Sequence, residues 1–282
     1  MAERMITVRG VQLCAESFGD PGQPPVLLIM GTGASMLWWE DDFCRELAAS
    51  GMFVIRYDHR DTGRSVTYEP GRPGYESGDL VEDAVGVLDA FAIRAAHLVG
   101  ASAGGALAQL VALDHPDRTI TLTLISTTFA VSTPCGRDLP GPTREFIRFV
   151  QAAHPDWTDN DSVVDHLVGY AEMLTGGRRQ FPERAVRGLV QADVRRAHNP
   201  ASAQNHDLLA DAPRDRPPLA SIRVPTLVVH GAADPMFPLP HGQALADEIP
   251  GARLLVLPDS GHGVERADWT ALTSAIREHT AR

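Results

Sequence analysis

Short apolar runs alternate with longer amphipathic stretches along most of the chain. This alternation is typical of strands joined by crossover helices. The apolar runs predict eight strands, at residues 5–8, 11–17, 26–30, 53–57, 96–101, 121–126, 226–230 and 253–257. The last six are rich in Val, Leu and Ile on both faces, which favours parallel strands with helices covering each side. The first two predict an antiparallel hairpin at one edge of the sheet.

The amphipathic stretches predict helices at residues 38–49, 78–91, 103–114, 240–248 and 265–280. Residues 127–221 break the alternation. They contain helical patterns, at 143–153 and 160–174 among others, interrupted by Pro and Gly and without a convincing strand. The pattern therefore predicts an α/β fold with a mostly parallel eight-stranded sheet and helices on both faces. Residues 1–126 and 222–282 form its core, and 127–221 form a helical insertion after the sixth strand.

Composition and charge narrow the possible partners. Hydrophobic residues make up 44% of the 282 residues, enough for a sizeable core. Against 36 Asp and Glu there are 25 Lys and Arg, and the net charge of −11 argues against nucleic acid or anionic membranes as partners. No segment approaches the roughly 20 uncharged apolar residues of a membrane span, and the first ten residues do not resemble a signal peptide. The sequence does not define an oligomeric state.

The three cysteines, Cys14, Cys44 and Cys135, are widely spaced and odd in number. They form neither a CxxC pair nor a Cys/His cluster with zinc spacing. We therefore expect no disulfide framework, no bound metal or other cofactor, and a reducing cytoplasmic location.

The most specific motif is a G-x-S-x-G at residues 100–104, between a predicted strand and a predicted helix. In that context the motif predicts a strained strand-to-helix turn that lifts the Ser102 hydroxyl above the carboxyl edge of the sheet as a nucleophile. Side chains at Gly100 and Gly104 would collide with neighbouring elements in so tight a turn. The alternative is an ordinary turn of small residues.

A serine nucleophile needs a base, and the base needs an acid that orients it. Asp234 follows the seventh predicted strand and His262 follows the eighth, in the chain order Ser, Asp, His. Each has a simpler explanation alone, because Asp before Pro235 is a frequent turn residue and a loop histidine is usually solvated. Asp259 is a competing acid. The three positions together predict Ser102 as nucleophile, His262 as a base on a glycine-flanked loop free to fold over the nucleophile, and Asp234 as the orienting acid.

An acyl-transfer site also needs two N–H donors for the developing oxyanion. We expect one from Ala103, directly after the nucleophile, and the other from Thr32 in the loop after the third strand. Gly31 and Gly33 flank Thr32 and would let the backbone approach the substrate closely. A glycine-rich loop could instead bind phosphate, but neither GxxxxGK nor GxGxxG is complete here.

These motifs resemble the α/β-hydrolase superfamily over almost the whole chain. The stretch Y-D-H-R-D-T-G-R-S at 57–65 and the Met-Gly pair at 30–31 are similar to those of aclacinomycin methylesterase-type carboxylic ester hydrolases. The resemblance implies an α/β-hydrolase fold whose insertion 127–221 is a cap, and a bulky, partly apolar ester substrate. Two residues depart from the common pattern: Ala103 stands where Met or Gln is frequent, and Met30 replaces the usual histidine.

The resemblance leaves three functions to weigh. A serine at position 102, where haloalkane dehalogenases and epoxide hydrolases have aspartate, disfavours both of those activities. A serine esterase is the leading hypothesis. Carbon–carbon bond hydrolases and cofactor-free perhydrolases use the same triad, although perhydrolases usually carry an aromatic residue where this chain has Thr32. A small-molecule receptor on the same fold is the third possibility. The cap residues that could line the pocket or form the core of the cap are Trp157, Tyr170, Met173, Leu174 and Phe181.

Overall fold

The structure, a computed structural model, describes residues 3–131, 138–152, 154–210 and 215–281. Cys135, Ala153 and parts of the predicted insertion therefore lie outside the described residues. The eight strands form one sheet in the order β1-β2-β4-β3-β5-β6-β7-β8. Their bounds are Arg4–Val8 (β1), Val11–Phe18 (β2), Pro25–Ile29 (β3), Phe53–Tyr57 (β4), Ala96–Ala101 (β5), Thr119–Ile125 (β6), Thr226–Gly231 (β7) and Arg253–Leu257 (β8).

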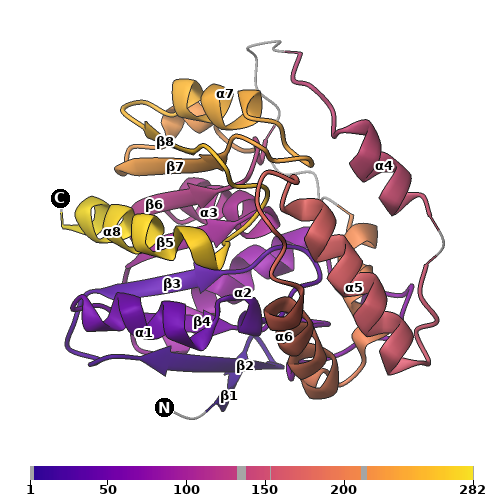
Figure 1. Cartoon of the computed structure of the whole chain (residues 1–282). Coiled ribbons are helices and arrows are strands. Elements are labelled where there is room, and N and C mark those ends of the chain that lie inside the picture. Colours follow the sequence, from indigo (N-terminus) through magenta and orange to yellow (C-terminus); the bar gives the residue numbers. More distant parts are fainter. Residues whose placement is uncertain (1–2, 132–137, 153, 211–214, 282) are drawn as a thin grey trace.

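Six of the strands are parallel, and β1 and β2 form the antiparallel hairpin at one edge, as predicted. Helices cover both faces of the sheet (Figure 1). The α-helices are Asp41–Ala49 (α1), Ser77–Ala90 (α2), Ala103–Asp114 (α3), Arg144–Val150 (α4), Asn160–Leu174 (α5), Glu183–Arg196 (α6), Pro240–Glu248 (α7) and Trp269–Thr280 (α8). Short 3₁₀ helices are Met36–Trp38 (η1), Pro116–Arg118 (η2), Pro200–Leu208 (η3), Leu219–Ser221 (η4) and Arg266–Asp268 (η5).

The continuously apolar strands supply two cores, because successive side chains point to opposite faces. On β3, Leu27 packs with residues of α2, α3 and α7, whereas Leu28 packs with residues of α1 and α8. β8 ends the sheet order and pairs with β7 alone, and its Val256 is 37% exposed. Leu254 and Leu255 of this strand still pack against the two opposite cores, as predicted.

Two predicted helices begin later than expected. The predicted helix 38–49 is a 3₁₀ turn, η1, followed by α1 from Asp41, and the predicted helix 265–280 begins as η5 before α8 starts at Trp269. In the first case, the Ser35 hydroxyl accepts a hydrogen bond from Leu37 N–H and caps the 3₁₀ turn separately.

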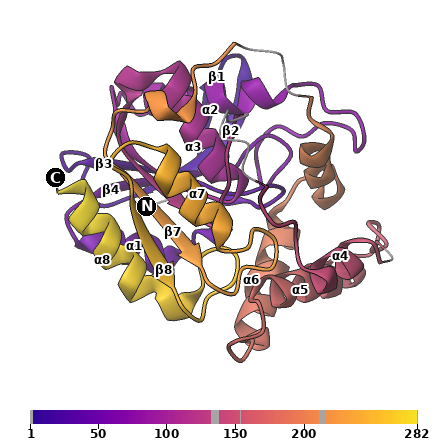
Figure 2. The same cartoon turned by 90° about the horizontal axis from the view of Figure 1, so that it is seen from above.

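Between β6 and β7, the described residues form helices and irregular segments without a strand. The predicted helix 143–153 ends as α4 at Val150, and α6 adds a helix that was not predicted. The helices α4, α5 and α6 lie together to one side of the sheet (Figure 2). A small apolar cluster of valines joins α5 to α6, formed by Val163, Val164, Val168, Val190 and Val194. This segment therefore has a small core of its own.

Candidate active site

The turn between β5 and α3 holds Ser102 in a strained conformation. Its backbone has φ 53° and ψ −123°, a region that costs a non-glycine residue about 1–3 kcal/mol. Ser102 N–H donates to the Ile125 carbonyl at the end of β6 (2.9 Å), and the Ser102 carbonyl accepts from Gly105 N–H (2.9 Å). The turn is thus fixed by backbone bonds on both sides of the predicted nucleophile.

Close backbone packing explains the glycines of this turn, as predicted. A Cβ on Gly100 would overlap the Gly104 carbonyl, and a Cβ on Gly104 would overlap the carbonyl of Ile29 at the end of β3. At Gly105 a Cβ would lie 2.8 Å from Thr127 Cγ2. Only a residue without a side chain leaves β3, β5 and α3 this close together.

The predicted acid and base form a buried pair. His262 Nδ1 lies 2.8 Å from Asp234 Oδ2, and the two residues are 8% and 3% exposed. Asp234 Oδ1 accepts from the N–H groups of Met236 (2.9 Å) and Phe237 (2.8 Å). A carboxylate only accepts, so Nδ1 carries the proton and Nε2 is left as the basic nitrogen. The competing acid, Asp259, is exposed.

The loop that carries His262 is held on both sides by hydrogen bonds. His262 N–H donates to the Leu174 carbonyl at the end of α5 (2.7 Å), and Gly263 N–H donates to Ser126 Oγ (3.2 Å). Gly261 packs so closely against Leu174 that a Cβ would overlap its carbonyl. The absence of a side chain at Gly261 therefore allows this close packing.

Strand order places the three predicted residues at one edge of the sheet. Ser102, Asp234 and His262 follow β5, β7 and β8, which are parallel neighbours through β6. Residues at the end of β6 connect them, because Ile125 binds the backbone of Ser102 and the adjacent Ser126 binds the loop of His262. The arrangement suits proton transfer from the hydroxyl to an imidazole that the carboxylate orients.

The loop after β3 lies against the nucleophile turn. A Cβ on Gly31 would stand 3.1 Å from Ser102 Cβ and 3.6 Å from Ser102 Oγ. Ala34 N–H closes a turn onto the Gly31 carbonyl (3.3 Å), with Gly33 at φ 68°. Thr32 is exposed, and no described residue accepts a hydrogen bond from its N–H. Ala103 is the first residue of α3, where N–H groups have no acceptor within the helix. Both predicted oxyanion donors are therefore free to bind a ligand.

Comparisons with known proteins agree with this fold. The alpha/beta hydrolase fold family matches residues 24–264. The chain belongs to this family. It is 36% identical to rhodomycin D methylesterase DauP of Streptomyces sp. (strain C5), over 99% of this chain and 98% of that protein. It is 34% identical to rhodomycin D methylesterase DnrP of Streptomyces peucetius, with the same coverage. A solved hydrolase from Pseudomonas aeruginosa PA01 superposes with a TM-score of 0.71 at 27% identity, covering 99% of this chain and 98% of that one.

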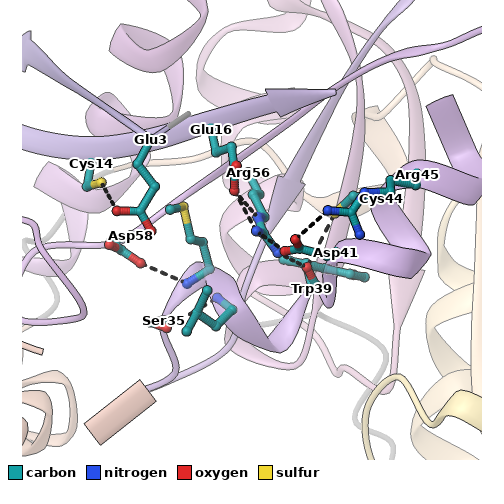
Figure 3. Close-up of polar contacts among 12 residues, drawn as sticks. Glu3, Cys14, Glu16, Ser35, Trp39, Asp41, Cys44, Arg45, Arg56 and Asp58 are labelled. Atoms are coloured by element: carbon teal, nitrogen blue, oxygen red, sulfur yellow. Dashed lines mark hydrogen bonds and ion pairs between the residues drawn. The ribbon is translucent and has the colours of Figure 1, made fainter. Parts of the chain in front are cut away.

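The Y-D-H-R-D-T-G-R-S stretch of this alpha/beta hydrolase organises the loops around the site. Asp58 is fully buried and accepts from Met36 N–H and Arg64 N–H, both at 2.9 Å. Figure 3 shows Asp58 directed at η1, and Glu16 and Asp41 directed at the buried Arg56. The stretch thus fixes the loop after β3 that carries Thr32, one of the two predicted oxyanion donors.

Three histidines near the site, of which His59 and His230 are buried and His206 is half-buried, were not predicted to support it. His59 Nε2 bonds the Met30 carbonyl (3.0 Å), His206 contacts the loop after β3, and His230 Nε2 donates to the Phe237 carbonyl (2.7 Å) beside Asp234. Burial lowers the pKa of all three, that of His59 to about 3. They are therefore neutral hydrogen-bonding groups near neutral pH. His59 and His230 adjoin strand ends, which is a usable sequence signal, whereas His206 has none.

Other side chains of the alpha/beta hydrolase offer little for a different chemistry. Burial raises the pKa of the Cys14 and Cys44 thiols to about 12, so both are poor nucleophiles. Among the described residues, no group of three or more His, Cys, Asp or Glu side chains could hold a metal ion. None of the described helices combines the length and apolar character that a membrane span requires.

Proposed function

We propose that this protein hydrolyses a carboxylic ester through an acyl-enzyme on Ser102. The protein is a carboxylic ester hydrolase on the alpha/beta hydrolase fold, and its full-length similarity to two methylesterases favours a methyl ester. The observation that carries the assignment of roles is the buried Asp234–His262 pair at the sheet edge where the strained Ser102 lies. Ala103 and Thr32 are the proposed oxyanion donors, with Gly31 and Gly33 giving the substrate access.

In the proposed reaction, His262 Nε2 takes the Ser102 proton as Oγ bonds the substrate carbonyl carbon. The carbonyl oxygen becomes an oxyanion that the two N–H groups stabilise. The alkoxy C–O bond then breaks, and the leaving alcohol receives the proton from His262. Water repeats the sequence in reverse: its proton goes to His262, its oxygen bonds the acyl carbon, and Ser102 leaves with the proton. Asp234 stabilises the imidazolium at each step without being protonated.

We further propose that residues 127–221 act as a cap and that the substrate is a bulky, partly apolar small molecule. Trp157 and Leu167 of this segment, together with Gly33, line a small cavity beside the loop after β3 at residues 30–34 (the oxyanion loop). Trp157 and Phe181 also pack on the valine cluster, and Tyr170 packs on Phe146 and Phe149, which supports a core role for most of the predicted lining residues. No cofactor enters the proposal. The acidic charge and two free buried thiols support a cytoplasmic site of action, away from nucleic acid and membranes.

The decisive experiment is a panel of methyl and p-nitrophenyl esters of graded size, run with the wild-type protein and the Ser102→Ala variant. We expect hydrolysis by the wild type and a loss of at least about 10³-fold in kcat for the variant. A fluorophosphonate probe should label the wild type, and His262→Ala should abolish labelling. Full labelling of that variant would remove His262 from the mechanism.

Adding a vinylogous diketone to the panel separates the alternatives. Cleavage of this diketone but of none of the esters would favour a carbon–carbon bond hydrolase. A receptor would bind its ligand and keep its biological output in the Ser102→Ala variant, whereas the proposed esterase loses its activity.

A further inference from the structure

His206 is a half-buried imidazole that bridges two loops of the core from a distant part of the chain. It lies in η3, between β6 and β7, and its partners are 173 and 146 residues away. Nδ1 lies 3.0 Å from Gly33 N, and Nε2 lies 2.8 Å from the Arg60 carbonyl. The first contact is to the oxyanion loop itself, in the residue next to Thr32.

One protonation state alone satisfies both contacts. Gly33 N–H donates, so His206 Nδ1 has to be the unprotonated acceptor; the Arg60 carbonyl accepts, so Nε2 carries the proton. Burial keeps the imidazole neutral by lowering its pKa, although Asp61 and Asp207 oppose that shift. The His206 side chain thus accepts a hydrogen bond from the Gly33 backbone. This bond fixes the peptide plane between Thr32 and Gly33, which is next to the peptide plane that carries Thr32 N–H.

The oxyanion loop needs such external support. Two of its residues, Gly31 and Gly33, are glycines with a large conformational freedom to lose, and Gly33 stands at φ 68°. At its start the Met30 carbonyl is bound by His59, whose ring packs edge-on against His206 with centroids 5.9 Å apart. The loop is therefore held at both ends by imidazoles, one from the core and one from the segment between β6 and β7.

We propose that His206 is a positioning residue that holds Thr32 N–H in place as an oxyanion donor, so that η3 must be docked before the site is competent. This inference rests on the proposed ester hydrolysis. Oxyanion donors act within a narrow distance range, and a displacement of about 1 Å can cost about 10²-fold in rate. His206 does not touch the substrate; its effect reaches the reaction through the loop.

Two substitutions separate the two bonds. In His206→Asn, the amide oxygen stands as many bonds from Cα as Nδ1 does, so the variant keeps an acceptor for Gly33 N–H and loses the donor to Arg60. In His206→Gln, the amide nitrogen stands as many bonds from Cα as Nε2 does, so the variant keeps the donor and loses the acceptor. Each removes one hydrogen bond, and we expect similar losses in melting temperature.

The proposal expects kcat for a methyl ester to fall about 10- to 100-fold in His206→Gln, with KM changed less than about threefold, and to stay within about threefold of wild type in His206→Asn. Affinity for a trifluoromethyl ketone, which forms an oxyanion on Ser102, should fall in parallel with kcat. Equal losses of kcat in both variants, or a change in KM alone, would overturn the proposal.

A measurement on the unaltered protein covers the case in which a variant fails to fold. Nitrogen NMR of the His206 ring should show a proton on Nε2 and none on Nδ1. A proton on Nδ1 would exclude the bond from Gly33 and overturn the proposal. Failure of the underlying function is separate: it appears as ester hydrolysis that persists in Ser102→Ala, whatever the His206 variants do.

Discussion

The turn that carries Ser102 and the segment between β6 and β7 differ in the contacts that hold them. Backbone fixes the turn, through the close approach of Gly104 to β3 and the bond from Ser102 N–H to Ile125. The segment has backbone bonds to the core, such as that from His262 N–H to the Leu174 carbonyl, but it also depends on polar side chains, through Arg196 on Asp58 (2.7 Å) and Arg179 on Asp268 (2.7 Å).

This difference separates two tasks. Backbone contacts tolerate few substitutions, because no side chain can be exchanged to relieve a clash, and they suit atoms that must stay in one geometry for the reaction. Polar side-chain contacts can be replaced one at a time. We therefore expect changes in the core turn and triad to abolish activity, and changes in the ion pairs of the segment to alter stability and the fit of the substrate; His206, which acts on Thr32, is the exception.

The largest effect is expected at the orienting acid. Asp234→Asn keeps the shape of the side chain but replaces an acceptor of the His262 proton with an amide, so kcat should fall by about 10⁴-fold with little change in melting temperature. Asp259→Asn, at the competing exposed acid, is the matched control and should stay within about twofold of wild type. A large loss in the Asp259 variant with none in the Asp234 variant would reverse the assignment.

Next in size is a glycine of the nucleophile turn. In Gly104→Ala the new methyl group overlaps the Ile29 carbonyl, and backbone cannot move aside cheaply, so the variant should lose about 3 kcal/mol of unfolding free energy together with its activity. Urea denaturation measures the first and ester hydrolysis the second.

Gly188→Ala in α6 is the control for this prediction. That glycine is exposed and has no neighbour within 4 Å of an added Cβ. Alanine there should stabilise the helix by about 0.5–1 kcal/mol and leave kcat unchanged. Equal effects of the two substitutions would contradict the contrast between turn and segment.

A smaller effect is expected from the ion pair that attaches α6. Arg196→Met removes the cation from the buried Asp58, which keeps two backbone donors, so the loss of unfolding free energy should be about 2 kcal/mol. Arg195→Met, at the exposed neighbouring position, should change it by less than about 0.5 kcal/mol. If Arg196→Met lowered kcat as strongly as Asp234→Asn, the ion pair that attaches α6 would be needed for the reaction itself and not only for stability.

How far the sequence predicts this molecule follows the same division. The eight strands, the Gly100–Gly104 turn and the residues after β7 and β8 carry local signals: apolar runs, glycine spacing and chain order. The edge position of β8 has no local signal, because an apolar strand does not reveal whether a second strand pairs with it. Contacts of Arg196 and His206 join residues far apart in the chain and have no local signature. The helix α6 has a local signal, because Val186, Val190 and Val194 recur at helical spacing. The charged residues between them obscured this signal.

The smallest expected effect concerns the buried histidine His97 on β5. Burial, with a smaller contribution from His279, lowers its pKa from 6.5 to about 4, so the folded protein keeps His97 neutral while the unfolded chain binds a proton as the pH falls below 6.5. Its contribution to stability is therefore complete above pH 6.5 and is lost progressively toward pH 4, at about 1 kcal/mol per pH unit.

His97→Asn keeps a partner for Thr121 but does not titrate, so urea midpoints at pH 7 and 5 should differ less than in the wild type. His154→Asn, at an exposed position, should leave that difference unchanged. An unaltered pH dependence in His97→Asn would show that other buried groups, such as His59 in the loop beside the site, carry the acid sensitivity.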